Sequence, residues 1–97
     1  MMTTRGEIKR KLKAIKPHLR QEYAVKNIGL FGSFADGTDT AKSDIDILVE
    51  FEKPIGWRFF SLEMFLEKIF ERKIDLVTRN GLKKQIEPFI LSQLQYI

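Results

Sequence analysis

Alternation of apolar and polar residues in the middle of the chain predicts two β-strands. Residues 25–31 are largely apolar, which is typical of a strand inside a sheet. Residues 44–51 alternate, and successive side chains of a strand point to opposite faces. One face then carries Ile45, Ile47, Val49 and Phe51, and the other carries Asp44, Asp46, Leu48 and Glu50. Asp44 and Asp46 are therefore predicted neighbours, roughly 6.5 Å apart.

A third short strand is predicted over residues 73–78, where Ile74 and Leu76 share one face and Asp75 lies on the other. If this strand pairs beside the second strand with its polar face on the same side, directly opposed Cβ atoms lie roughly 5 Å apart. Asp75 would then join Asp44 and Asp46 in one group of carboxylates.

Apolar residues at helical spacing predict helices at both ends of the chain. Residues 4–16 form an amphipathic pattern that starts with a capping box of Thr4 and Glu7. Pro17 predicts the start of a second, short helix that ends before residue 25. Near the other end, a helix is predicted to begin at Leu82 and to be kinked or restarted by Pro88. Its core-facing residues would be Ile86, Phe89, Ile90 and Leu94.

Residues 57–72 predict a further helix with two apolar groups. The core stripe consists of Phe59, Leu62, Phe65, Leu66, Ile69 and Phe70. Trp57, Phe60 and Met64 fall on the other side, although a helix of a globular domain needs only one apolar stripe. One interpretation is that the terminal helix or the loop after residue 52 buries them. Our hypothesis is that they pack on another chain, for example in an oligomer.

Helices interspersed with about three short strands predict an α/β domain. Its small mixed sheet would carry helices packed mainly on one face, which leaves the other face and its edge for a ligand. The whole chain, residues 1–97, is expected to form a single domain, because this length supports one modest core.

Composition excludes several kinds of chemistry. The chain has no cysteine, which excludes a disulfide framework, thiolate catalysis and a cysteine zinc site. No apolar run at the N-terminus resembles a signal peptide or a membrane span, so we expect a cytoplasmic protein that does not enter a membrane. His18 is the only histidine and is most simply a surface residue at a helix start.

The net charge of +4 is concentrated before residue 25. The basic residues there are Arg5, Lys9, Arg10, Lys11, Lys13, Lys16 and Arg20. The simplest interpretation is the solvated face of an amphipathic helix. The alternative is a docking surface for an acidic partner or for nucleic acid.

The residues around the first two strands favour a site for phosphate and metal. Gly32 follows the first strand and lets the backbone approach an anion, and Ser33 offers a hydroxyl and an amide at a predicted helix start. Asp44 and Asp46 repel each other unless a cation lies between them. Mg²⁺ prefers carboxylate oxygens and often shares its coordination shell with phosphates.

The set of motifs resembles the minimal nucleotidyltransferases (MNT type) of the DNA polymerase β superfamily. Their pattern is GS-x-A-x-G, D-x-D and a third Asp, and here it reads Gly32-Ser33 with Gly37, residues 43–49 with both aspartates, and residues 74–77 with Asp75. The resemblance covers residues 13–97. It implies a polymerase β palm-like nucleotidyltransferase fold and transfer of a nucleoside monophosphate, AMP from ATP, to a hydroxyl group with release of pyrophosphate.

The resemblance also implies roles for individual residues. Asp44 and Asp46 would bridge two Mg²⁺ ions, while Asp75 would hold the catalytic ion and help to deprotonate the acceptor. Gly32 and Ser33 would bind the β and γ phosphates. The family often has Arg where this chain has Asp36, and Lys42 in the same loop would partly compensate as a nucleotide-binding cation.

Larger relatives carry a further domain that binds the acceptor, whereas this chain is short. The acceptor would therefore come from a partner, and the resemblance points to a HEPN ribonuclease toxin that is modified and neutralised by its antitoxin. Two alternatives stay open. The chain could be a catalytically weak binding module that neutralises its partner sterically, or it could modify a small molecule or RNA. Direct nucleic-acid binding is not expected.

Overall fold

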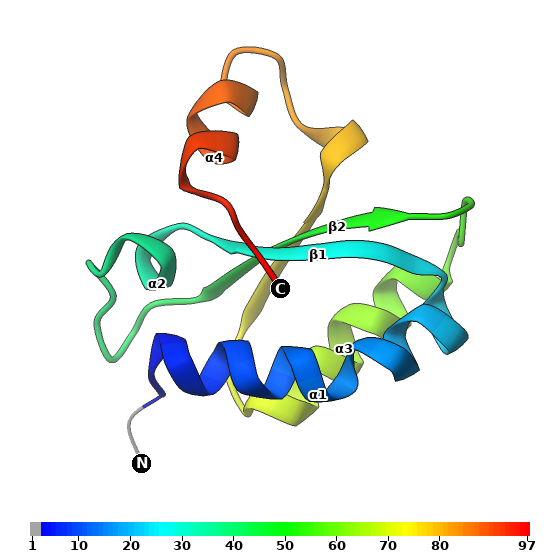
Figure 1. Ribbon diagram of the computed structural model, residues 1–97, viewed down its shortest axis with the longest axis horizontal. Coiled ribbons are helices and arrows are strands. Elements are labelled where there is room, and N and C mark those ends of the chain that lie inside the picture. The colour runs from blue at the N-terminus through cyan, green and yellow to red at the C-terminus, as the bar shows by residue number, and fades with distance from the viewer. Residues whose placement is uncertain (1–2) are drawn as a thin grey trace.

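The computed structural model describes residues 3–97 as one mixed sheet with helices on both of its faces (Figure 1). In chain order the elements are α1 Arg5–Tyr23, β1 Val25–Phe31, α2 Ser33–Asp36, β2 Ile45–Phe51, α3 Arg58–Phe70, β3 Ile74–Thr78, the 3-10 turn η1 Arg79–Gly81, α4 Glu87–Gln93 and β4 Gln95–Tyr96. The strand order is β3-β2-β1-β4. β1 is antiparallel to β2 and β4, while β2 and β3 are parallel. The α/β class is confirmed, with four strands where about three were predicted.

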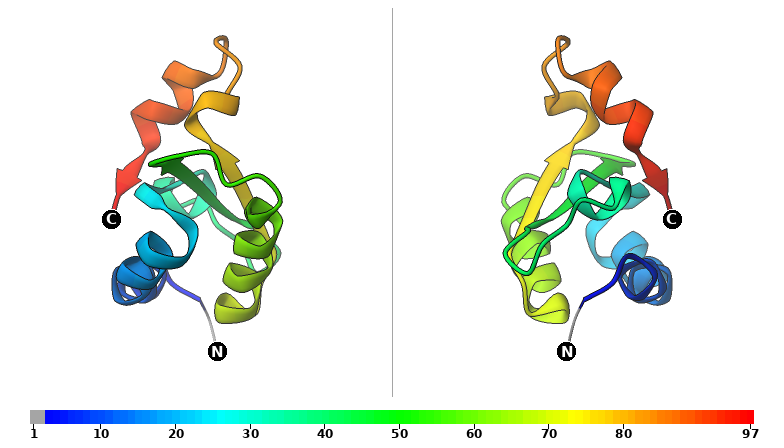
Figure 2. Two further views of the ribbon diagram at one scale, coloured as in Figure 1. Left: turned by 90° about the vertical axis from the view of Figure 1, so that its right-hand side faces the viewer. Right: turned by 90° about the vertical axis from the view of Figure 1, so that its left-hand side faces the viewer.

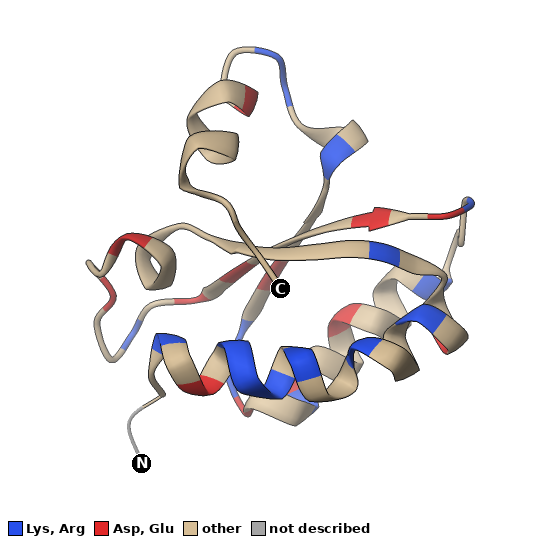
Figure 3. Ribbon diagram, in the orientation of Figure 1, with Lys and Arg blue, Asp and Glu red and all other residues tan. Residues whose placement is uncertain are grey.

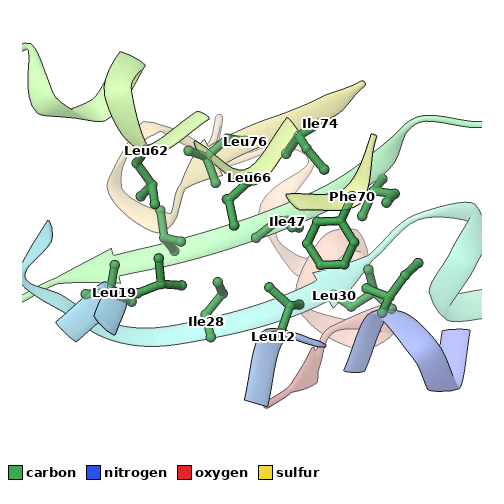
Figure 4. Close-up of a cluster of buried hydrophobic side chains, with 14 of the residues drawn as sticks. Leu12, Leu19, Ile28, Leu30, Ile47, Leu62, Leu66, Phe70, Ile74 and Leu76 are labelled. Carbon is green, nitrogen blue, oxygen red and sulfur yellow. The ribbon is translucent and has the colours of Figure 1, made fainter. Parts of the chain in front are cut away.

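The main core lies between the sheet and the pair α1 and α3, which cover the same face (Figure 2). Apolar side chains from alternate positions of the strands meet the apolar stripes of both helices (Figure 4). Its fully buried members include Leu12, Leu19, Ile28, Leu30, Ile47, Leu62 and Leu66. The predicted alternation of residues 45–51 is confirmed, and it leaves the opposite face of β2 for Asp46 and Leu48.

α1 is one continuous helix, so the prediction of a separate helix starting at Pro17 is wrong. Pro17 lies inside the helix on an exposed turn. The apolar stripe continues past it to the buried Leu19, and burying that side chain outweighs the hydrogen bond that proline cannot donate. At the start, the backbone N–H of Glu7 donates to the Thr4 hydroxyl over 3.2 Å, which confirms the Thr4 half of the predicted capping box.

α3 confirms the predicted helix and its core stripe. The second apolar group is not buried within the chain, because Trp57, Phe60 and Met64 are 85%, 54% and 69% exposed. The interpretation that the terminal helix or the preceding loop buries them is therefore wrong.

The C-terminal helix starts later than predicted. Residues 82–86 are not helical, and α4 begins at Glu87 with Pro88 in its first turn, where the missing N–H has no helical partner to lose. Ile86 and Phe89 do not return to the core, since they are 46% and 65% exposed. Ile90 is buried in a second cluster with Phe31 and Leu48, on the sheet face opposite α1 and α3, and the half-buried Leu94 packs against this cluster.

The last residues of the chain pack closely against Gly29 of β1. A Cβ at Gly29 would lie 2.6 Å from Leu94 Cδ1, so only glycine in β1 leaves room for that side chain. β4 then pairs with β1. None of the helices within residues 3–97 combines the length and the apolar character that crossing a membrane requires.

Candidate active site

Asp46 and Asp75 lie opposite each other in the parallel pair of β2 and β3. Ile45 on one side of Asp46 and Ile47 on the other belong to the main core, so the Asp46 side chain projects from the other face of the sheet. Asp44 comes just before β2, which starts at Ile45. The expectation that the third strand places Asp75 beside Asp46 is met by the register of the strand pair. The predicted group of three carboxylates is not formed within the described residues, since Asp44 lies outside this close pair.

The electrostatics of Asp46 reflect this crowding. Burial, the charge of Asp75, a hydrogen bond with Asp75 and the charge of Asp44, in that order of importance, together raise the pKa of Asp46 to about 6. The two salt bridges within residues 3–97 are Lys11–Glu7 and Arg79–Glu50, so no lysine or arginine forms an ion pair with these three aspartates. The site therefore holds negative charge that is not compensated by the chain.

Such a donor set fits a hard divalent cation, because Mg²⁺ binds carboxylate oxygens and removes their mutual repulsion. The fit is incomplete before an ion binds. Within the described residues, no three acidic, histidine or cysteine side chains already lie close enough to form a metal site. Asp46 and Asp75 form the close pair, while Asp44 contributes to it only through its charge.

The glycine turn after β1 lies directly against this pair. Gly32 has a backbone φ of 73° and precedes α2. A Cβ at Gly32 would lie 2.0 Å from Asp46 Oδ2, so any side chain at this position would displace the Asp46 carboxylate. Glycine is therefore required twice, for the left-handed φ and for the space. The first two amides of α2, those of Ser33 and Phe34, have no partner within the helix by the geometry of a helix start.

α2 is held in place by two side chains that the sequence analysis did not single out. Arg5 Nη1 and Gln95 Nε2 both donate to the carbonyl oxygen of Ala35 over 2.9 Å. They come from the first residue of α1 and from β4, which are 30 and 60 residues away in the chain. No local pattern in the sequence signals contacts of this range. Arg72, which contacts the loop before β2, was also missed; its only signal is its nearness to Asp75 in the chain.

Asp36 has a structural role in the turn after α2. Its carboxylate accepts hydrogen bonds from the Thr38 hydroxyl and backbone N–H over 2.6 and 2.9 Å, and both lower the pKa of Asp36. It thus shapes the turn after α2. Lys42 is exposed in the same loop, two residues before Asp44, and its contact with phosphate stays a prediction.

Two cavities of the described residues lie away from this site. One of about 420 Å³ is at the far ends of β2 and β3 and includes Glu50 and Arg79. The other, of about 520 Å³, runs along α1 beside Lys13, Lys16 and Arg20. Neither of these two cavities is lined by the three aspartates or by Gly32. Figure 3 shows acidic positions on β2 and β3 and basic positions along α1.

Curated relatives resemble the chain over almost its full length. MJ1215 of Methanocaldococcus jannaschii, which is provisionally named a protein adenylyltransferase, is 48% identical over 82 residues, or 84% of this chain and 95% of MJ1215. The protein adenylyltransferase MntA of Thermococcus cleftensis is 39% identical over 97 residues, which cover 99% of this chain and 98% of MntA.

A solved structure extends the likeness to three dimensions. It is described as a toxin–antitoxin with AMP-PNP, and its matching chain is 26% identical, with a TM-score of 0.73 over 87% of this chain and 69% of that chain. Residues 12–97 also match the family described as nucleotidyltransferase domain. The resemblance drawn from the Gly-Ser and aspartate motifs is confirmed, and the chain belongs to the nucleotidyltransferase domain family.

Proposed function

We propose that this chain transfers AMP from ATP to a hydroxyl group of a partner protein. The observation that carries the proposal is the meeting of Asp46 and Asp75 across two strands, directly against the Gly32 turn. A nucleotidyltransferase needs carboxylates for cations beside a turn that admits phosphate, and these three elements provide both.

In this reaction the acceptor oxygen attacks the α-phosphorus of ATP, and the bond from that phosphorus to the pyrophosphate oxygen breaks. The acceptor hydroxyl loses its proton, and pyrophosphate leaves with the electron pair. Asp75 is the most exposed of the three aspartates, so it is the one that an acceptor on another molecule reaches first. We assign it the role of orienting that hydroxyl and accepting its proton.

Asp44, Asp46 and Asp75 would hold two Mg²⁺ ions, which stabilise negative charge on the phosphate oxygens when they are bound. Asp44 must turn toward the other two carboxylates, since the three do not form a metal site without an ion. Gly32 and Ser33 would bind the β and γ phosphates, and Lys42 would approach them from the loop. The close approach of Asp46 to the Gly32 turn supports placing the cations and the phosphates side by side.

The partner that we propose is a HEPN-type toxin, which this chain would neutralise as its antitoxin. The relatives named protein adenylyltransferases support a protein acceptor. The toxin–antitoxin structure with AMP-PNP supports both a toxin partner and an adenine nucleotide. The exposure of Asp75 also supports an acceptor supplied by another molecule.

Incubation with ATP labelled at the α-phosphate, Mg²⁺ and the candidate toxin tests this proposal. We expect label on the toxin, and we expect Asp44→Asn to abolish it while the variant stays folded. Lys26→Gln, an exposed change on β1 outside the site, is the matched control and should label normally.

A second function, steric neutralisation by a binding module, is favoured by one observation. Asp36 occupies a position where an arginine would attract a triphosphate, and its carboxylate instead accepts hydrogen bonds from Thr38. Under this alternative, the toxin is neutralised without being labelled, and neutralisation survives Asp44→Asn.

We further propose that Trp57, Phe60 and Met64 contact another chain. Trp57 and Phe60 lie with their ring centres 5.7 Å apart, and all three side chains are largely exposed on one side of α3. Replacing Phe60 and Met64 by serine should weaken association with the toxin, or of the chain with itself, at least about tenfold. Unchanged association in both assays would contradict this contact.

A further inference from the structure

Arg72 holds the segment that leads into Asp44. Its Nη1 atom donates to the carbonyl oxygen of Ser43 over 3.1 Å, and its Nη2 atom donates to that of Ala41 over 2.9 Å. Both bonds span about thirty residues of chain, from the connection between α3 and β3 to the loop before β2. The guanidinium group thus uses its planar fork on two backbone carbonyls.

The turn that Arg72 contacts is closed by hydrogen bonds between residues of the turn itself. The backbone N–H of Thr40 donates to the Ser43 hydroxyl over 2.8 Å, and the N–H of Ser43 donates to the Thr40 carbonyl over 3.1 Å. The turn therefore moves as a unit, and its position depends on what holds it from outside. The carbonyl of Ser43 shares a rigid peptide plane with the N–H of Asp44, so fixing the former fixes where Asp44 begins.

The same guanidinium also touches the other half of the site. Its central carbon lies 5.3 Å from the ring centre of Phe34, which is 1% exposed and belongs to α2, two residues after Gly32. Phe34 gives the guanidinium a rigid support. Arg72 consequently links α2, which follows the Gly32 turn, to the segment that leads into Asp44.

We propose that Arg72 is a positioning residue, which fixes the Asp44 segment relative to the Gly32 turn so that the three aspartates can share their cations. The catalytic part of this inference rests on the proposed function. Arg72 does not act by neutralising the aspartates, since it forms no salt bridge with Asp44, Asp46 or Asp75 in the described chain. Lysine cannot replace it, because one ammonium group cannot reproduce the planar fork that reaches both carbonyls.

Hydrogen exchange of the protein alone, without nucleotide, tests the structural part. Arg72→Ala should speed amide exchange in residues 40–44 at least about tenfold, because the turn loses its outside support. Arg58→Ala is the matched control, since Arg58 also stacks on a ring, that of Tyr23, with 5.5 Å to its centre. The control should leave exchange in residues 40–44 unchanged. Equal exchange in Arg72→Ala and the wild type would overturn the proposal.

Transfer kinetics test the catalytic part. Misplacement by about 1 Å can lower a rate about a hundredfold, so kcat of Arg72→Ala should fall roughly 10- to 100-fold. The Mg²⁺ concentration for half-maximal activity should rise several-fold, while KM for ATP changes less than about threefold. Arg72→Lys should keep most of the defect, and millimolar guanidinium should partly restore Arg72→Ala but not Asp44→Asn.

The outcomes separate this inference from the proposed function. Absence of labelling by the wild-type chain would overturn the function, while the exchange comparison would still decide whether Arg72 holds the turn. Faster exchange with an unchanged kcat would overturn the catalytic role of Arg72. If Arg72→Ala does not fold by circular dichroism, Arg72→Lys carries both comparisons.

Discussion

At the scale of single residues, the site depends on a carboxylate that is placed where its charge is unfavourable. Asp46 is half-buried, lies beside two further aspartates and touches the glycine turn. An arrangement of this kind does not stabilise the fold by itself. It is explained if a cation that is not part of the chain completes it.

The raised pKa of Asp46 predicts how stability depends on pH. The folded state binds a proton at Asp46 with a pKa of about 6, whereas the ordinary value is 3.8. The folded state therefore holds more protons than the unfolded state between these pH values, and its stability falls as the pH rises through 6. Asp46→Asn removes this loss, so we expect a higher urea midpoint than the wild type at pH 7 and an equal one near pH 4.

Mg²⁺ provides the control for that experiment. It should raise the melting temperature of the wild type at pH 7, because an ion that binds only the folded state stabilises it. It should not raise that of Asp46→Asn. A lower urea midpoint for Asp46→Asn at pH 7, without Mg²⁺, would contradict the crowding of carboxylates described above.

A side chain at Gly32 is predicted to lower both the stability of the fold and the affinity for ATP. Gly32→Ala combines the strain of a positive φ with a clash against Asp46, so we expect a loss of about 2–4 kcal/mol in unfolding free energy and at least tenfold weaker ATP binding. Gly56 has a φ of 56° with no atom within 4 Å of a Cβ. Gly56→Ala should therefore cost only about 1 kcal/mol and leave ATP binding, measured by calorimetry, unchanged.

At the scale of elements, α1 shows how packing overrides a local signal. The apolar stripe passes Pro17 without a break, and Leu12 and Leu19 on either side of it are fully buried. Tertiary contacts therefore keep one helix of 19 residues where the proline predicted two.

Pro17→Ala should accordingly stabilise the protein by about 1–3 kcal/mol, because it restores a helical N–H and removes the proline ring from the helix interior. The urea midpoint measures this gain. Gln21→Ala, one turn later on the exposed side, should stay within about 0.5 kcal/mol of the wild type. A loss of stability in Pro17→Ala would show that α1 needs the proline to fit against the sheet.

The strands could be predicted from the sequence, and so could the faces of residues 45–51, because a period of two is a local property. The register that places Asp75 opposite Asp46 could only be assumed, since it depends on the packing of α3 between the two strands. The start of α4 could not be predicted. Residues 82–86 show helical spacing, yet contacts of Ile90 with Phe31 and Leu48 decide where that segment lies.

At the scale of the whole molecule, positive and negative charges occupy different places (Figure 3). α1 contains seven basic and two acidic residues, while the rest of the chain contains ten basic and eleven acidic ones. The positive net charge of the protein is therefore due to α1 and does not mark the aspartate site. A triphosphate meets carboxylates there, which repel it in the absence of cations.

This separation predicts that ATP binding depends on divalent ions. Chelation with EDTA should weaken binding at least about a hundredfold, because the ions that join carboxylate and phosphate are then removed. Titration calorimetry with and without Mg²⁺ measures the difference. Arg20→Gln, on α1, should leave the affinity for Mg²⁺–ATP unchanged, and a strong loss in that variant would place the nucleotide on α1 instead.

A crystal structure of the protein with Mg²⁺ and a non-hydrolysable ATP analogue tests the central claim most directly. We predict Mg²⁺ ions at about 2.0–2.1 Å from carboxylate oxygens of Asp44, Asp46 and Asp75, with the phosphates of the analogue at the amides of Gly32 and Ser33. Density for the analogue in the cavity beside Glu50 and Arg79 or along α1, with the aspartates free of metal, would contradict the account.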